Sequence, residues 1–376
     1  MLGVGHAFDM YPIGAAPPRY PPAVPDLHAP SSVAFRREPR RTRLHDPRRG
    51  FALTEVESEI RWDPLTGESS RICHFSLPRP PAPDIAAVDE ARRAGCPFCP
   101  ERVGTVTPRF PEEWFAGGRF RRGEAVVFPN LFPYDDLSAV VVPGPRHVVD
   151  TADVPVELVV SGLAAARDFL RAALPRLGGV ESYGLVTWNH LPPAGGTQIH
   201  PHLQAVGTSE PGNSVRRELA AEATWRAAHG RPFAADLLAA EERAGRVVGR
   251  SGRWTWLVPF APTGVLGDCR AYLPGKATVL DLDDGEIEDF AAGLRRALAA
   301  FAALGLWSFN LTFFPDRTGA PPERHWLSAR LLPRAWLDGA LHVPDANFMH
   351  LLLREPFTMA LPEEVAARLR PAFDRP

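Results

Sequence analysis

Residues 189 to 204 read Asn-His-Leu-Pro-Pro-Ala-Gly-Gly-Thr-Gln-Ile-His-Pro-His-Leu-Gln. The preceding run, 183 to 188, is apolar and rich in residues typical of strands, and residues 200 to 206 alternate between polar and apolar. That alternation is the period of a half-buried strand. We therefore predict a strand, a glycine-rich loop and a second strand. The two later histidines and the final glutamine are expected to project from one face of the second strand.

The loop and its histidines indicate chemistry on a phosphoryl group. Gly195 and Gly196 let the backbone approach a ligand closely, and the N–H groups of 195 to 197 are expected to donate to phosphoryl oxygens. A neutral imidazole at His202 is a nucleophile toward phosphorus near pH 7, and a hydrogen bond from its second nitrogen to a backbone carbonyl would fix its tautomer. Gln204 can donate to the same phosphoryl group but cannot shuttle a proton, so a nucleotidyl-histidine would wait for a second substrate. A polar strand without catalysis is the alternative.

Composition sets the general class of the protein. The 376 residues are 45% hydrophobic and 23% charged, with a net charge of −2. These values are typical of a globular protein with no general attraction for nucleic acid or membranes. No apolar run approaches the ~18 residues of a membrane helix, and a signal-peptide pattern is absent from the N-terminus. We expect a cytoplasmic protein that binds neither nucleic acid nor membranes.

The cysteines indicate a metal site. Four cysteines are too few for a disulfide scaffold in a chain of this length, and two of them form the pair Cys96-Pro-Phe-Cys99. Such a pair can bind one metal ion through two thiolates, and a closed zinc site needs two further ligands. His147 and either His200 or His202 are the candidates by position. The set with His200 would be a structural zinc site, and two packed thiols beside a surface histidine are the alternative.

Three regions are predicted along the chain. Residues 1–50 are rich in proline and arginine and are expected to form a flexible or surface-wrapping arm. Residues 51–215 form the N-terminal zinc-binding catalytic unit. Residues 216–376 repeat the first unit's order of strands, Pro-Gly turn, helix and strands, with Pro143-Gly144 matched by Pro274-Gly275.

The second unit is expected to be degenerate. Ser328-Ala329-Arg330 stands where the first unit has His200-Pro201-His202. Each unit should contain one long helix, over 155–174 in the first and from a capping box of Asp283 and Glu286 in the second. The predicted fold is α+β, with two tandem units, each an antiparallel sheet with helices, that arose by internal duplication.

These motifs resemble the galactose-1-phosphate uridylyltransferase family of the histidine-triad superfamily. A Cys-Pro-x-Cys pair, a Val-Phe-x-Asn segment at 127–130 and a Pro-x-His ending at His147 appear in the family order. The resemblance covers about residues 60 to 370. The family pattern Asn…Gly-x-Ser…His-Pro-His-x-Gln is matched by Asn189, Gly195, Thr197, His200, Pro201, His202 and Gln204.

The resemblance implies two histidine-triad-like units that exchange a nucleoside monophosphate between a nucleoside diphosphate sugar and a sugar 1-phosphate. His202 would be the nucleophile, assisted by Gln204. A homodimer is expected by family analogy. The implied ligands of one structural Zn²⁺ are Cys96, Cys99, His147 and His200, and the implied substrate contacts are Arg79, Phe128, Asn130, Asn189, Gly195, Gly196 and Thr197.

Three departures from the family pattern concern the metal and the substrate. Glu218 stands where some members hold a second metal, but Ser328 and Arg330 replace two histidines of that site, and we expect Glu218 to be solvated on a charged helix. The segment 347–349 is followed by leucines in place of the Tyr and Glu that would bind sugar hydroxyls. Leu131 replaces an acidic residue of the uridylyl enzymes, as in relatives that act on adenylylated sugars. The sugar and the base therefore stay open.

Two other functions stay open as well. The protein could be a phosphorylase that uses inorganic phosphate and releases a nucleoside diphosphate from an ADP-sugar or a dinucleoside polyphosphate. It could also be a zinc-stabilised nucleotide-binding protein without turnover, which the degenerate second unit permits.

Overall fold

The computed structural model describes residues 33–74, 82–177 and 181–374. Its strands are β1 (Arg37–Asp46), β2 (Ala52–Trp62), β3 (Ser69–Cys73), β4 (Phe120–Arg122), β5 (Ala125–Pro129), β6 (Leu137–Val142), β7 (Tyr183–His190), β8 (Leu203–Thr208), β9 (Val247–Ser251), β10 (Trp254–Leu257), β11 (Cys269–Tyr272), β12 (Ser308–Phe314), β13 (Ser328–Arg334), β14 (Trp336–Asp338), β15 (Val343–Pro344) and β16 (Phe357–Thr358). Its α-helices are α1 (Ile85–Arg93), α2 (Pro100–Val106), α3 (Val156–Ala173), α4 (Asn213–His229), α5 (Phe233–Arg243), α6 (Asp284–Ala303) and α7 (Pro362–Phe373).

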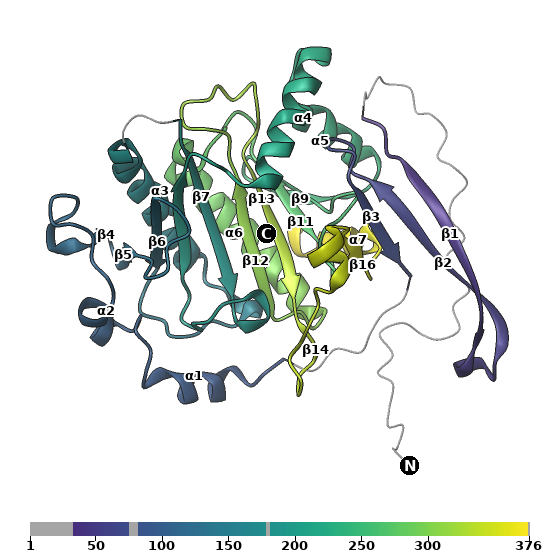
Figure 1. Cartoon of the computed structure of the whole chain (residues 1–376), viewed down its shortest axis with the longest axis horizontal. Coiled ribbons are helices and arrows are strands. Elements are labelled where there is room, and N and C mark those ends of the chain that lie inside the picture. The colour runs from purple at the N-terminus through teal and green to yellow at the C-terminus, as the bar shows by residue number, and fades with distance from the viewer. Residues whose placement is uncertain (1–32, 75–81, 178–180, 375–376) are drawn as a thin grey trace.

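A ten-stranded antiparallel sheet forms the centre of the molecule (Figure 1). Its order is β4-β5-β6-β8-β7-β12-β13-β11-β10-β9. Counted from either edge, the two halves follow the chain in the same order, because β4-β5-β6-β8-β7 corresponds to β9-β10-β11-β13-β12. β7 and β12 pair in the middle, where Asn189 lies opposite Asn310. The mixed α+β fold with antiparallel strands is confirmed, but the two units share one continuous sheet, and their origin by duplication stays a prediction.

Two long helices cover one face of this sheet. α3 and α6 contact each other and bury apolar side chains in the main core. Pro155 precedes the first turn of α3, where the fixed φ of proline suits a helix start, and Asp283 and Glu286 form the predicted capping box of α6. Both predicted helices are therefore confirmed to within a few residues. No helix in the described ranges is long and apolar enough to cross a membrane.

A second, four-stranded sheet lies to one side, in the order β1-β2-β3-β16 (Figure 1). The prediction of a flexible arm over 1–50 is wrong for 37–46, which pair with β2 along their whole length. Cross-strand ion pairs stabilise this polar hairpin, as where Arg41 lies 3.5 Å from Glu57. Such a strand lacks the apolar alternation that sequence patterns detect. Residues 1–32 lie outside the described residues.

Candidate active site and metal centre

The four predicted metal ligands come together in one buried cluster. Cys96 and Cys99 lie just before α2, His147 follows β6, and His200 precedes β8. Their ligand atoms all lie within 4.8 Å of one another. The Cys99 Sγ lies 3.3 Å from the His147 Nδ1, and the Cys96 Sγ lies 3.7 Å from the His200 Nδ1. The chain thus joins three separate segments at one point.

This geometry fits a tetrahedral metal ion. Bonds of about 2.3 Å to sulfur and about 2.0 Å to nitrogen place such atoms roughly 3.6 Å apart. The His200 Nε2 donates to the Gly144 carbonyl at 3.0 Å, which turns its Nδ1 toward the cysteines. Burial and then the neighbouring Cys96 raise the pKa of Cys99 to about 11. A thiolate at Cys99 would therefore need a nearby cation, and the donor set of the cluster suits zinc.

His202 lies beside this cluster with a defined tautomer. Its Nδ1 is 2.8 Å from the His200 carbonyl oxygen, so Nδ1 carries the proton and Nε2 keeps its lone pair. The predicted hydrogen bond to a backbone carbonyl is therefore present. Burial lowers the pKa of His202, although this hydrogen bond acts in the opposite direction. The imidazole is 8% exposed and contacts the Phe98 ring edge at a centroid distance of 5.2 Å.

Strand β8 begins at Leu203, three residues later than predicted. His200 and Pro201 therefore belong to the connecting segment, and His200 points to the metal cluster. Gln204 lies opposite Thr187 of β7 and is partly exposed. Its amide makes no hydrogen bond within the described part of the chain, so it is free to contact a ligand.

The glycine loop is a tight turn whose N–H groups are largely used internally. The Gly195 N–H donates to the Pro192 carbonyl at 2.9 Å, and the Gly196 N–H donates to the Leu191 carbonyl at 3.2 Å. The prediction that these two groups donate to a phosphoryl oxygen is therefore wrong for this conformation. Gly196 is needed for another reason, because a Cβ there would lie 2.7 Å from the Asn189 carbonyl oxygen.

The other predicted substrate contacts occupy different positions. Phe128 is buried on β5 and packs against Phe98 at a centroid distance of 5.6 Å. The Asn130 Oδ1 accepts from the Phe132 N–H at 3.1 Å and shapes the loop after β5. Thr197 is exposed at the end of the glycine turn. Arg79 lies outside the described residues.

Helix α4 packs against the second half of the molecule through its charged side chains. Glu218 is only 8% exposed, and its Oε1 accepts from the Arg270 Nη1 at 3.1 Å. The prediction that Glu218 is solvated is therefore wrong. Glu222, one helical turn later, is also buried, and its Oε2 lies 3.2 Å from the His325 Nδ1. The charged side of α4 faces the protein because the sheet supplies partners of opposite charge, including Arg270, which also donates to Ser328.

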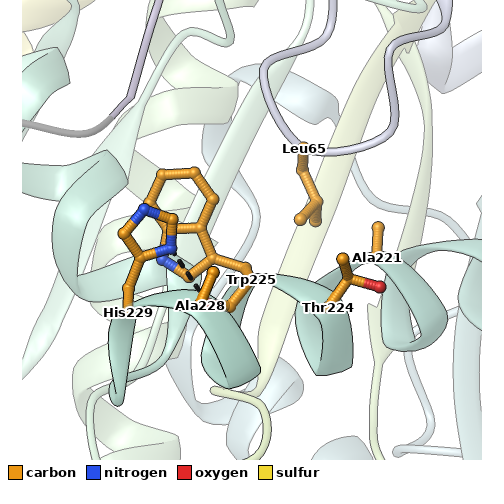
Figure 2. A pocket seen from close by; sticks show the side chains of 6 residues that line it. All are labelled: Leu65, Ala221, Thr224, Trp225, Ala228 and His229. Carbon is orange, nitrogen blue, oxygen red and sulfur yellow. Dashed lines mark hydrogen bonds between the residues drawn. The ribbon is translucent and has the colours of Figure 1, made fainter.

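A shallow hollow also lies on α4 (Figure 2). It is lined by Leu65 and by residues of α4, among them Trp225 and His229, whose rings stack at a centroid distance of 3.9 Å. Among the described residues, none of the predicted catalytic, substrate or metal residues lines it. The hollow is therefore separate from the cluster around His202.

The chain is similar to one curated protein in sequence and to several solved structures in fold. No family model matches the sequence. A protein of Archaeoglobus fulgidus, described only as uncharacterized, is 28% identical over 276 residues, which are 72% of this chain and 80% of that protein. A uridylyltransferase structure is 25% identical with a TM-score of 0.61, over 84% of this chain and 98% of that one. An ADP-glucose phosphorylase from Arabidopsis thaliana is 18% identical with a TM-score of 0.63, over 83% of this chain and 98% of that one.

Fold and site together define a protein with a uridylyltransferase-like fold and a buried Cys2His2 cluster that could bind one metal ion, next to a His-Pro-His segment. The chain has the fold of these uridylyltransferase and ADP-glucose phosphorylase structures, and the predicted resemblance is confirmed.

Proposed function

We propose that the protein is a nucleotidyltransferase that exchanges a nucleoside monophosphate between a nucleoside diphosphate sugar and a sugar 1-phosphate. The observation that carries the proposal is the hydrogen bond from the His202 Nδ1 to the His200 carbonyl. It leaves Nε2 unprotonated, and the lowered pKa of His202 keeps the ring neutral near pH 7. A neutral imidazole with one fixed tautomer has the properties of a nucleophile.

The first half-reaction breaks the phosphoanhydride bond of the donor. The His202 Nε2 attacks the α-phosphorus, a phosphorus–nitrogen bond forms, and the sugar 1-phosphate leaves with the bridging oxygen and its electron pair. The imidazole then carries a positive charge, which the Nδ1–H shares with the His200 carbonyl. In the second half-reaction, a phosphate oxygen of the acceptor attacks the same phosphorus and the bond to Nε2 breaks.

Gln204 acts on the phosphoryl group in both steps. It follows His202 by two residues at the start of β8, and its amide is free to donate to a phosphoryl oxygen as charge moves there. An amide cannot relay a proton from water. The covalent intermediate is therefore preserved for the acceptor.

A phosphorylase is the second candidate. The similarity in fold to an ADP-glucose phosphorylase supports it, and so does Leu131 in the loop after β5. The first half-reaction would be the same, with inorganic phosphate as the acceptor. Incubation of the adduct with phosphate alone, or with glucose 1-phosphate alone, separates the two functions by the product released.

We further propose one structural zinc on Cys96, Cys99, His147 and His200, because sulfur and nitrogen donors in a closed set favour zinc. Bound there, zinc would hold the segment that carries His202 in place. We also propose a homodimer, and an origin of the two halves by duplication, which the repeated strand order supports. The catalytic unit would span 51–215 and the degenerate unit 216–376.

The decisive experiment is intact-protein mass spectrometry after brief mixing with UDP-glucose, UDP-galactose, ADP-glucose and diadenosine tetraphosphate in turn. We expect a uridylyl or adenylyl increment that maps to His202 and identifies the base. If no donor labels the protein although nucleotides bind measurably, the protein is a nucleotide-binding protein without turnover.

A further inference from the structure

We propose that Asn310 and Arg334 of the second half are positioning residues for the loop that presents His202 with its substrate. This inference rests on the proposed function for its catalytic meaning. Both residues lie on strands on the second-half side of β7, Asn310 on β12 and Arg334 on β13. They come from the unit that lacks the His-Pro-His segment, and they act through Asn189.

The amide of Asn310 holds both ends of the glycine loop. Its Nδ2 donates to the Asn189 Oδ1 at 2.7 Å and to the Ala194 carbonyl at 2.8 Å. Asn189 stands near the end of β7, and Ala194 lies inside the turn. One side chain therefore fixes where the strand ends and where the turn begins to return toward His200.

Arg334 fixes which way the amide of Asn310 points. The Arg334 Nη1 donates to the Asn310 Oδ1 at 2.5 Å, so the opposite side of the amide must face Asn189. Arg334 is itself held by Asp345, which is 3% exposed and accepts from the Arg334 Nε at 2.7 Å. A charge-assisted pair that is partly buried is well suited to hold this geometry.

The chain of hydrogen bonds from Arg334 through Asn310 decides which way the amide of Asn189 points. Because its Oδ1 accepts from Asn310, the two N–H groups of its own amide are left for other partners. Trp188 pairs with Leu203, so the next residue, Asn189, lies beside His202. The site thus presents hydrogen-bond donors, which suit phosphoryl or ribose oxygens, next to the nucleophile. Both donors and the acceptor of Asn310 are used within the protein, which makes it a positioning residue.

The loop needs such support. Leu191 has a φ of 66°, a backbone conformation that is unfavourable for a residue with a side chain, and the turn that follows uses its own N–H groups. The Ser308 Oγ adds a further bond from β12 to the His190 carbonyl at 2.6 Å. Strand β12 therefore holds the loop in a conformation that the loop sequence alone does not favour.

The test uses Asn310→Asp, which keeps the size of the side chain and the pairing with Arg334. A carboxylate has no N–H, so it cannot donate to Asn189 or Ala194, and the Asn189 amide would turn its N–H groups toward the new carboxylate and away from the site. We expect faster hydrogen exchange confined to 189–199, and covalent labelling of His202 at least about tenfold slower. Arg334→Met should give the same two changes to a smaller extent. Arg334→Lys should be closer to the wild-type protein than Arg334→Met in both measurements.

Arg324→Met is the matched control. Arg324 also pairs with a buried carboxylate, Asp316, but it lies away from the glycine loop and contacts none of its residues. We expect normal exchange at 189–199 and normal labelling in this variant. Unchanged exchange and labelling in both Asn310→Asp and Arg334→Met would overturn the inference. Hydrogen exchange needs no turnover, so it tests the hydrogen bonds from Arg334 through Asn310 to Asn189 even if the wild-type protein forms no adduct.

Discussion

At the scale of the residue, the chemistry depends on one nitrogen of His202. The His200 carbonyl holds the proton on Nδ1. Nε2 therefore has no proton, and no base is needed before it attacks. His202→Gly removes the nucleophile and little else, because the ring is held by one hydrogen bond and by contact with Phe98. We expect the exchange of label between sugar 1-phosphate and nucleotide sugar to fall by roughly 10⁴-fold or more. Exchange at the wild-type rate would reject His202 as the nucleophile, and His342→Ala, at an exposed histidine, is the control.

Gln204 decides what happens to the intermediate. An imidazole at this position could accept a proton from water, whereas the amide cannot. In Gln204→His we expect the nucleotidyl-enzyme to be hydrolysed faster, by about tenfold or more, so that free nucleoside monophosphate replaces part of the transfer product. Chromatography of the products without an acceptor measures this ratio. An unchanged lifetime of the adduct would show that Gln204 does not protect it from water.

At the scale of the element, α4 is anchored by two buried pairs: Glu218 with Arg270 of β11, and Glu222 with His325 in the segment before β13. The Nε2 of His325 donates to the Phe314 carbonyl at 2.8 Å, and its Nδ1 faces Glu222. Burial lowers the pKa of His325, but the Glu222 carboxylate, the hydrogen bond to the Phe314 carbonyl and the charge of Glu218 together outweigh this effect, and the pKa is raised. The charged pair is thus favoured in the folded protein, and each pKa unit corresponds to about 1.4 kcal/mol.

This shift predicts a pH dependence of stability. The folded pKa of His325 lies above its unfolded value of about 6.5, so the stabilisation is complete below that pH and is lost as pH rises through the folded pKa. Glu222→Gln should lower the free energy of unfolding at pH 6. It should also make this free energy fall less steeply as the pH rises above 6.5. Urea unfolding at several pH values measures both, with the exposed Glu288→Gln as control. A decline as steep as in the wild-type protein would exclude this pair as its cause.

At the scale of the whole molecule, a metal ion in the Cys2His2 cluster would tie the first half together. The four residues come from the segment before α2, from the segment after β6 and from the segment before β8. We expect about one zinc per chain. Zinc at about 1,000 times its dissociation constant would stabilise the fold by about 4 kcal/mol, which a chelator should remove.

Cys96→Ser should lose the metal, because one of four ligands is gone, and should lower the melting temperature as the chelator does. Metal analysis and calorimetry test this expectation. Cys73→Ser is the matched control, since Cys73 is a half-buried thiol outside the cluster. Well-folded wild-type protein without any metal would remove the zinc proposal.

The sequence by itself determined the residues that are close to one another in the chain or that follow a local pattern. It predicted β7, the turn and β8 from residue type and alternation, and it predicted α3 and α6 from their apolar spacing and their starts. The cysteine pair was recognisable because both thiols come from one short segment. Its partner histidines were identified by family order, and the structure brings all four ligands together.

Only the tertiary structure decided which side chains meet across the sheet. The contact of Asn310 with Asn189 was missed, although an asparagine between apolar residues of a strand was a signal that could have marked it. Its pairing with Asn189 depends on the register of β7 and β12, two strands far apart in the chain. Glu218 was misread because a charged helix face appears solvated until the sheet supplies Arg270. Long-range register and charge pairing are set by the packing of the whole chain, so no local pattern contains them.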